Sequence, residues 1–170
     1  KHAEILIGKA KLKSDSKGVT TPGDKNLASG DSEELAGERK SDYRSRCMRG
    51  SYLSLDRPDP QYAVKESSRR MSSPIGDDVP KLQRIARYLL YRRRVIQRFD
   101  WQRIPSRLTV ECDSDHAGCR LTRKSTTGYV GMMGRHTVAM RSVTQSLLAL
   151  SSAEAEFYAL CSASSAAMGM

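Results

Sequence analysis

The stretch that most constrains the fold is residues 108–164, where strand-like alternation gives way to helical spacing. Residues 108–114 alternate between apolar and polar side chains, which predicts a strand with one face towards a core. Residues 128–133 and 136–141 predict two further strands. The Gly134-Arg135 pair between them predicts a tight turn, and short glycine-bearing connections favour an antiparallel meander.

A helix is predicted after these strands, beginning at the capping-box pattern of Ser151 and Glu154. Four residues fall on one stripe of this helix and are expected to face the core: Phe157, Leu160, Ser164 and Met168. Glu156 lies beside that stripe, so we expect it at the edge of the buried face. The order strand, strand, strand, helix predicts an α+β fold.

Two acidic stretches lie at the ends of these elements. Asp113 is off the apolar face of the first strand, near its C-terminal end, and Glu156 follows the start of the helix. An acidic strand end that faces an acidic helix start can bring distant carboxylates together, and such carboxylates bind divalent metal. Two metals held close can cleave a phosphodiester. We interpret Asp115 as a turn residue and Glu154 as a helix cap, not as metal ligands.

Three segments carry a resemblance to a known family: residues 113–119 (DSDHAGC), 123–130 (RKSTTGYV) and 150–160 (LSSAEAEFYAL). In this order and spacing they resemble the ribonuclease H region of a copia-type LTR retrotransposon Pol polyprotein. Residues 57–64 (RPDPQYAV) are similar to the family segment that closes the reverse transcriptase. The resemblance implies a helical reverse-transcriptase connection followed by a partial ribonuclease H-like fold, a three-stranded antiparallel meander plus one helix.

The resemblance implies that the chain is divided into three parts. Residues 1–42 are expected to be the end of the reverse transcriptase and a polar linker, which covers residues 13–42. Residues 43–102 are expected to be the helical connection, and residues 103–170 the partial ribonuclease H-like domain. A short helix is predicted over residues 2–12.

The connection is expected to hold three helices. Residues 43–55 predict the first, and Arg57-Pro58-Asp59-Pro60 ends it. Asp59 can cap the next helix with Pro60 at its first position, and this helix is expected to run to about Met71. Five apolar residues at helical spacing predict the third, amphipathic helix: Leu82, Ile85, Ala86, Leu89 and Leu90.

The chain is basic, with 29 Lys and Arg against 19 Asp and Glu and a net charge of +10, which favours a polyanionic partner. The candidate nucleic-acid-binding residues lie on and after the amphipathic helix and in the loop before the second strand: Arg84, Arg87, Arg92, Arg93, Arg94, Arg123, Lys124 and Ser125. The alternative interpretation is a solvated charged face and a solvated polar loop. No apolar run predicts a membrane span, and scattered cysteines fit a reducing intracellular compartment, cytoplasm or nucleus.

By motif position, the resemblance implies that Asp113 and Glu156 are catalytic residues and ligands of Mg²⁺. The implied reaction is two-metal hydrolysis of the RNA strand of an RNA–DNA hybrid. His116 stands where the family has Trp, and we expect it to pack against the sheet. The family uses two further acidic residues later in the domain, beyond Met170, so we expect this chain to be inactive by itself.

The other partner implied is the remainder of the Pol polyprotein. No Tyr-x-Asp-Asp of a polymerase site is present. Both chain ends look cut, as expected of a polyprotein piece. Two alternatives stay open, namely a non-enzymatic basic nucleic-acid-binding fragment and a degenerate gene product.

Overall fold

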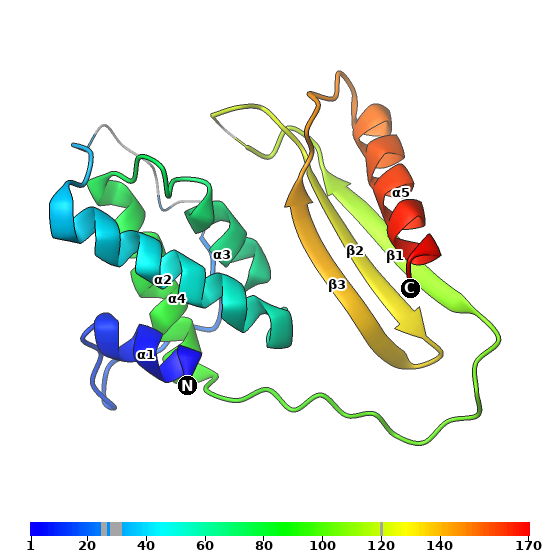
Figure 1. The fold of residues 1–170 in the computed structure, drawn as a ribbon, viewed down its shortest axis with the longest axis horizontal. Helices are drawn as coiled ribbons and strands as arrows, with labels where there is room; N and C mark the ends of the chain where they lie inside the picture. Colours follow the sequence, from blue (N-terminus) through cyan, green and yellow to red (C-terminus); the bar gives the residue numbers. More distant parts are fainter. Residues whose placement is uncertain (25–26, 28–31, 120) are drawn as a thin grey trace. The chain divides into compact units, whose positions relative to one another are not determined.

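A computed structural model describes residues 1–24, 27, 32–119 and 121–170, which form two compact units (Figure 1). The helical unit is Lys1–Ile96 and the sheet unit is Gln97–Met170. Part of the expected polar linker, residues 25–26 and 28–31, lies outside the described residues. The C-terminal part of that linker was predicted wrongly, because a helix already begins at Gly37.

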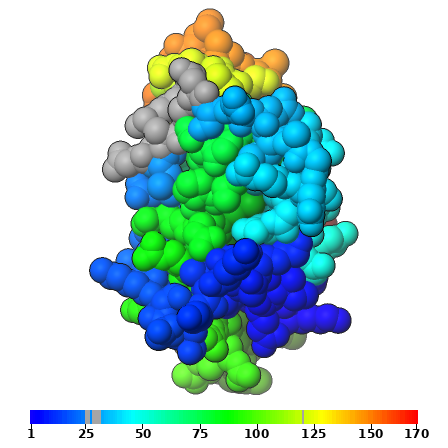
Figure 2. Space-filling model, turned by 90° about the vertical axis from the view of Figure 1, so that its left-hand side faces the viewer, coloured from blue at the N-terminus to red at the C-terminus, as the bar shows by residue number. Residues whose placement is uncertain are grey.

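The helical unit contains all the elements predicted for it, with shifted ends. Its described elements are α1 (His2–Lys9), α2 (Gly37–Asp56), α3 (Gln61–Ser68), the short 3-10 helix η1 (Gly76–Asp78) and α4 (Val79–Tyr91). The predicted helix over 2–12 ends at Lys9, since Lys11 takes a left-handed backbone conformation with φ of 54°. α1 and α4 pack against each other, as Figure 2 shows for the dark blue and green segments.

The core of the helical unit is built on α4. All five apolar residues predicted for this helix are buried, which confirms the helix and its inward face. Tyr43 and Cys47 of α2 and Val64 of α3 belong to the same core. A Cβ added at Gly50 would lie 3.1 Å from both methyl groups of Val64, so glycine lets α2 and α3 pack closely.

The break between α2 and α3 differs from the prediction. Asp59 does not cap α3; Pro60 occupies the N-cap position and the helix ends at Ser68. The Asp59 carboxylate accepts hydrogen bonds from Arg57 Nε (2.8 Å) and Nη2 (2.6 Å) and from the Tyr88 hydroxyl (2.7 Å). A bidentate Arg–carboxylate pair is stronger than a cap to one N–H, which explains the difference.

This Arg57–Asp59–Tyr88 network also fixes the end of α4. Arg57 is only 7% exposed, and its guanidinium donates to the carbonyl oxygens of Arg92 (3.1 Å) and Arg93 (3.3 Å). Burial opposes ionisation of Asp59, but the hydrogen bonds from Arg57 and Tyr88 outweigh it, so the pKa of the carboxyl lies below its ordinary value.

The sheet unit has the predicted meander. β1 (Leu108–Asp115), β2 (Thr126–Met133) and β3 (His136–Thr144) pair antiparallel in the order β1-β2-β3. Gly134, with φ of +61°, takes the left-handed conformation in the two-residue turn between β2 and β3, as its place in the sequence predicts. The last helix, α5 (Ser152–Met168), lies across one face of the sheet and contacts β1 and β2 (Figure 1).

The buried face of α5 was predicted wrongly. Phe157, Leu160 and Met168 are 61%, 54% and 85% exposed, and Ser164 is exposed as well. The sheet is covered instead by an alanine stripe, made up of Ala155, Ala159 and Ala163, each at most 2% exposed. Small side chains allow a helix to pack closely on a sheet, and these alanines form the face that α5 turns towards β1 and β2.

Candidate functional site

The candidate site lies where the C-terminal end of β1 meets the start of α5. Ser151 begins this helix as predicted, since its hydroxyl accepts the Glu154 N–H at 3.1 Å. One turn further on, Glu156 Oε1 accepts hydrogen bonds from the Ser114 hydroxyl (2.7 Å) and the Ser114 N–H (3.3 Å). Through this contact α5 is tied to the strand end that carries Asp113.

Asp113 lies one residue before Ser114 and is exposed. Ser114 is opposite Thr127 in the sheet register, and the side chain of Gln145 donates to both Thr127 Oγ1 (3.0 Å) and the Ala155 carbonyl (2.9 Å). Ser114 and Thr127 therefore share the face covered by α5. Because successive strand residues point to opposite faces, Asp113 is on the other face. The structure brings Asp113 and Glu156 to one end of β1, but on opposite sides of it.

This arrangement does not fit a two-metal centre. Among the described residues, no group of three or more His, Cys, Asp or Glu side chains lies close enough to hold a metal ion. One oxygen of Glu156 already accepts both Ser114 hydrogen bonds. Magnesium takes oxygen ligands in near-octahedral geometry, and the two predicted carboxylates do not converge on a common point.

The neighbouring acids have the roles predicted for them. The Asp115 carbonyl accepts the Gly118 N–H at 3.3 Å, so this residue forms the turn after β1. Glu154 accepts the Tyr158 hydroxyl (2.5 Å) and the Leu150 N–H (2.7 Å), and these two hydrogen bonds lower the pKa of the Glu154 carboxyl. The expectation for His116 is wrong, because the chain turns after Asp115 and leaves its side chain exposed.

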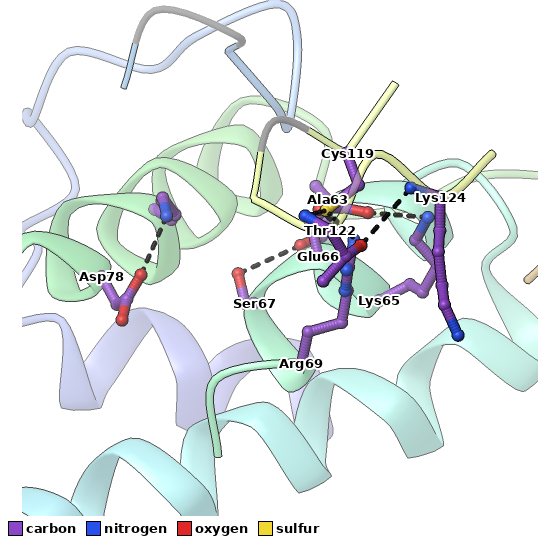
Figure 3. A network of polar contacts seen from close by, with 10 residues as sticks. Ala63, Lys65, Glu66, Ser67, Arg69, Asp78, Cys119, Thr122 and Lys124 are labelled. Atoms are coloured by element: carbon purple, nitrogen blue, oxygen red, sulfur yellow. Dashed lines mark hydrogen bonds and ion pairs between the residues drawn. The ribbon is translucent and has the colours of Figure 1, made fainter. Parts of the chain in front are cut away.

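The residues before β2 serve the fold. Ser125 is fully buried, and its hydroxyl accepts the Ala117 N–H at 3.0 Å. The Lys124 ammonium donates to the Ser146 carbonyl at 2.5 Å, while Arg123 is exposed with φ of 55°. Figure 3 labels Lys124 together with Cys119 and Thr122, and the Thr122 hydroxyl donates to the Cys119 sulfur at 3.0 Å.

Gln145 is a residue that the sequence reasoning missed. It is 8% exposed, and its side chain and backbone join β2, α5 and Ser125. A single glutamine after a predicted strand carries no periodic signal, and only the three-dimensional contacts identify it as part of the core.

The predicted basic residues of the helical unit fall into two groups. Arg84 donates to Thr21 Oγ1 (2.9 Å) and the Gly23 carbonyl (3.2 Å), and Arg87 donates to the Lys17 carbonyl (2.8 Å). These contacts hold residues 17–24 on α4, so both guanidinium groups contribute to the fold. The second group follows α4 and has exposed side chains: Arg92, Arg93 and Arg94.

Comparisons with known proteins agree with the resemblance carried by the motifs. The chain is 35% identical over 162 residues to the uncharacterized mitochondrial protein AtMg00810 of Arabidopsis thaliana, which covers 94% of this chain and 65% of that protein. It is 31% identical over 127 residues to each of the retrovirus-related Pol polyproteins from transposons RE1 and RE2 of the same plant.

The match to each Pol polyprotein covers 74% of this chain and 8% of the polyprotein, so the chain spans less than two thirds of all three relatives. No family model and no solved structure matches the chain. Over the described residues, no helix has both the length and the apolar character needed to cross a membrane. The chain is thus similar in sequence to a short region of two retrovirus-related Pol polyproteins and to most of the mitochondrial protein.

Proposed function

We propose that residues 103–170 are the first part of a ribonuclease H-like domain that acts, within a Pol polyprotein, on the RNA strand of RNA–DNA hybrids. The observation that carries this proposal is the contact between Glu156 of α5 and Ser114, which places the helix acid at the strand end that bears Asp113. The meander order and the relation to the RE1 and RE2 polyproteins support it. On this proposal, residues 1–42 close the reverse transcriptase and residues 43–102 form the connection.

We infer that the chain by itself does not hydrolyse hybrid. Asp113 and Glu156 lie on opposite sides of β1, and no third metal-ligating side chain completes a cluster among the described residues. Hydrolysis requires a rearrangement of this strand end, additional acidic ligands, or both.

The test is a hybrid-cleavage assay with magnesium, on this chain and on one extended by the residues that follow it in its gene. Each is assayed with and without Glu156→Gln, and Glu154→Gln serves as the matched control because this carboxylate caps α5. We expect cleavage only by the extended chain, lost with Glu156→Gln and kept with Glu154→Gln. Cleavage by the 170-residue chain that depends on Glu156 would disprove its inactivity, and no cleavage by the extended chain would disprove the hydrolase assignment.

A second candidate function is nucleic-acid binding without catalysis. It is favoured by the exposed run Arg92-Arg93-Arg94 and by the net charge of +10. Binding through phosphates weakens steeply as salt rises and needs no magnesium. If this function is correct, the chain should bind hybrid in the presence of a chelator. Changing the three arginines to glutamine should abolish that binding.

A further inference from the structure

Residues 97–107 form an extended segment of the sheet unit that precedes β1, and we call it the aromatic strap. Its sequence, QRFDWQRIPSR, combines two aromatic residues with three arginines and a single acid. No helix or strand is assigned to these described residues. The strap is therefore a basic, aromatic element whose role in the fold must come from its contacts.

The centre of the strap is fixed on the turn between β2 and β3. Gln102 Nε2 donates to the Met133 carbonyl (2.8 Å), and Gln102 Oε1 accepts the Arg135 N–H (2.9 Å). A Cβ added at Gly134 would lie 2.5 Å from Gln102 Oε1, so the amide packs directly on this turn. The Phe99 ring meets the His136 ring edge to face at 5.3 Å between centroids.

Between these anchors, Trp101 points to solvent. Its side chain is 85% exposed, although the neighbouring residues Phe99 and Gln102 are held on the sheet. Leaving a large aromatic ring in water forgoes the free energy of burying it, so such a ring on a fixed backbone is typical of a binding surface. Ile104, 96% exposed, extends the same apolar stretch.

The charges around Trp101 are mostly positive. Arg103, Arg107 and Arg135 are exposed, and Arg98 forms an exposed ion pair with Asp100 at 2.9 Å. An exposed pair of this kind contributes little and breaks easily when a competing anion arrives. Arg135 Nη2 donates to the Trp101 carbonyl at 3.4 Å, so this guanidinium lies beside the strap, and the other arginines belong to the same segment of the chain.

We propose that the aromatic strap and the β2–β3 turn bind single-stranded nucleic acid, with a base stacked on Trp101 and phosphates contacted by Arg103, Arg107 and Arg135. Single strands are favoured over duplexes because only an unstacked base presents its face to an aromatic ring. The charge of the surface distinguishes this occupant from an apolar protein segment. The proposal rests on neither Glu156 nor a metal, so it stands independently of the proposed hydrolase function.

The test exploits the fact that Trp101 is the only tryptophan of the chain, so intrinsic fluorescence reports on this surface directly. The full chain is titrated with oligothymidylate of about 12 nucleotides and with a duplex of the same length. We expect the single strand to quench the fluorescence and to bind more tightly than the duplex. We also expect the affinity to fall as salt rises.

Variants are compared by the anisotropy of labelled oligothymidylate. Trp101→Ala is expected to weaken binding about tenfold, by loss of one stacked base. Arg103→Gln with Arg107→Gln is expected to weaken binding severalfold and to reduce the salt slope by about two. Phe157→Ala is the matched control, because this exposed aromatic residue lies on α5, and it should leave the affinity unchanged.

Two results would overturn the proposal. One is unchanged oligothymidylate affinity in the Trp101→Ala variant. The other is an absence of oligothymidylate binding by the unsubstituted chain. If that chain also self-associates and Trp101→Ala abolishes the self-association, the strap is a contact between copies of the chain. Loss of hybrid cleavage in the extended chain would leave this test unaffected.

Discussion

The helical unit and the sheet unit bury different kinds of side chain. The helical unit buries several large apolar side chains, such as Leu82, Ile85 and Leu89. Among the described residues of the sheet unit, the buried side chains are mostly alanines and hydroxyls, and Tyr129 is the one large aromatic side chain buried there. The difference shows that hydrophobic spacing predicts burial well where helices pack through large side chains. For α5, whose buried face is made of alanines, hydrophobic spacing predicted the wrong face.

Paired polar groups define the interior of the helical unit. Asp78 is fully buried and accepts from the Lys81 ammonium (2.8 Å) and the Ile75 N–H (3.1 Å). Ser67, 1% exposed, donates to the Ala63 carbonyl at 3.0 Å, and Figure 3 shows this contact within α3. Each buried polar group in these examples has a partner, as a stable core requires.

Within this comparison, the largest decrease in the free energy of unfolding is expected when Arg57 of the helical unit is replaced. Arg57→Leu leaves the Asp59 carboxylate without its bidentate partner and releases the end of α4. Breaking a buried ion pair costs roughly 3–5 kcal/mol, and partial exposure of Asp59 puts this site towards the lower value. Chemical denaturation followed by circular dichroism measures the change in the free energy of unfolding.

The matched control for Arg57 is Lys40→Ala. Lys40 also forms an ion pair, with Glu34 at 2.6 Å, but Glu34 is 53% exposed. An exposed pair contributes about 0–1 kcal/mol. Equal effects of the two substitutions would show that the Arg57–Asp59–Tyr88 network is not the organising contact of the helical unit.

The second prediction tests which face of α5 is buried. Ala159→Leu inserts a large side chain between α5 and the sheet, where Ala159 is fully buried, and overpacking is expected to cost about 1–3 kcal/mol. Leu160→Ala removes an exposed side chain and should change the free energy of unfolding by about 0.5 kcal/mol or less. Thermal unfolding of both variants measures the contrast.

If Leu160→Ala destabilised the protein more than Ala159→Leu did, the apolar stripe, and not the alanine stripe, would face the sheet. Phe157→Ser offers an independent check, because its side chain is 61% exposed and the substitution should also be tolerated. If Phe157→Ser and Leu160→Ala both destabilise the protein strongly, the alanine stripe does not cover the sheet.

Local signals in the sequence predicted most elements of both units. The stripe of α4, the Ser151 cap and the Gly134 turn are determined by neighbouring residues, and each is confirmed. The misassigned residues depend on distant partners. Asp59 pairs with Arg57 close in sequence, but it also accepts from Tyr88, 29 positions away. The face of α5 that covers the sheet is made of alanines, and which face is buried depends on contacts with the distant strands.

The candidate site shows the same division. The sequence predicts that Asp113 lies near the end of a strand and that Glu156 follows the start of a helix, and both placements are confirmed. The side of β1 on which each carboxylate lies depends on two contacts between residues far apart in the chain. One is the pairing of Ser114 with Thr127, and the other is the hydrogen bond from Ser114 to Glu156 of α5. Spacing alone does not contain that information.

The smallest expected effect is the pH dependence contributed by Cys47 of the helical core. Burial raises the pKa of the Cys47 thiol from 9.0 to about 11, and burial also raises the pKa of its neighbour Tyr43 above its ordinary value. Between these pH values the unfolded chain loses the thiol proton while the folded chain retains it. The unfolded state then binds fewer protons, so stability is fully present below about pH 9 and falls as pH rises towards about 11.

Replacing Cys47 should therefore make the fall in the free energy of unfolding at alkaline pH smaller. Replacing an exposed thiol should change that fall less. For Cys47→Ala, we expect the fall in the free energy of unfolding over this pH range to be smaller by about 1–2 kcal/mol. The control is Cys161→Ala, whose thiol is exposed on α5 in the sheet unit. A flattening of equal size in both variants would mean that alkaline loss of stability does not arise in the helical core. If only Cys47→Ala reduces the fall, the ionisation of a buried thiol in the helical unit contributes to the alkaline loss of stability, whereas the exposed thiol of the sheet unit does not.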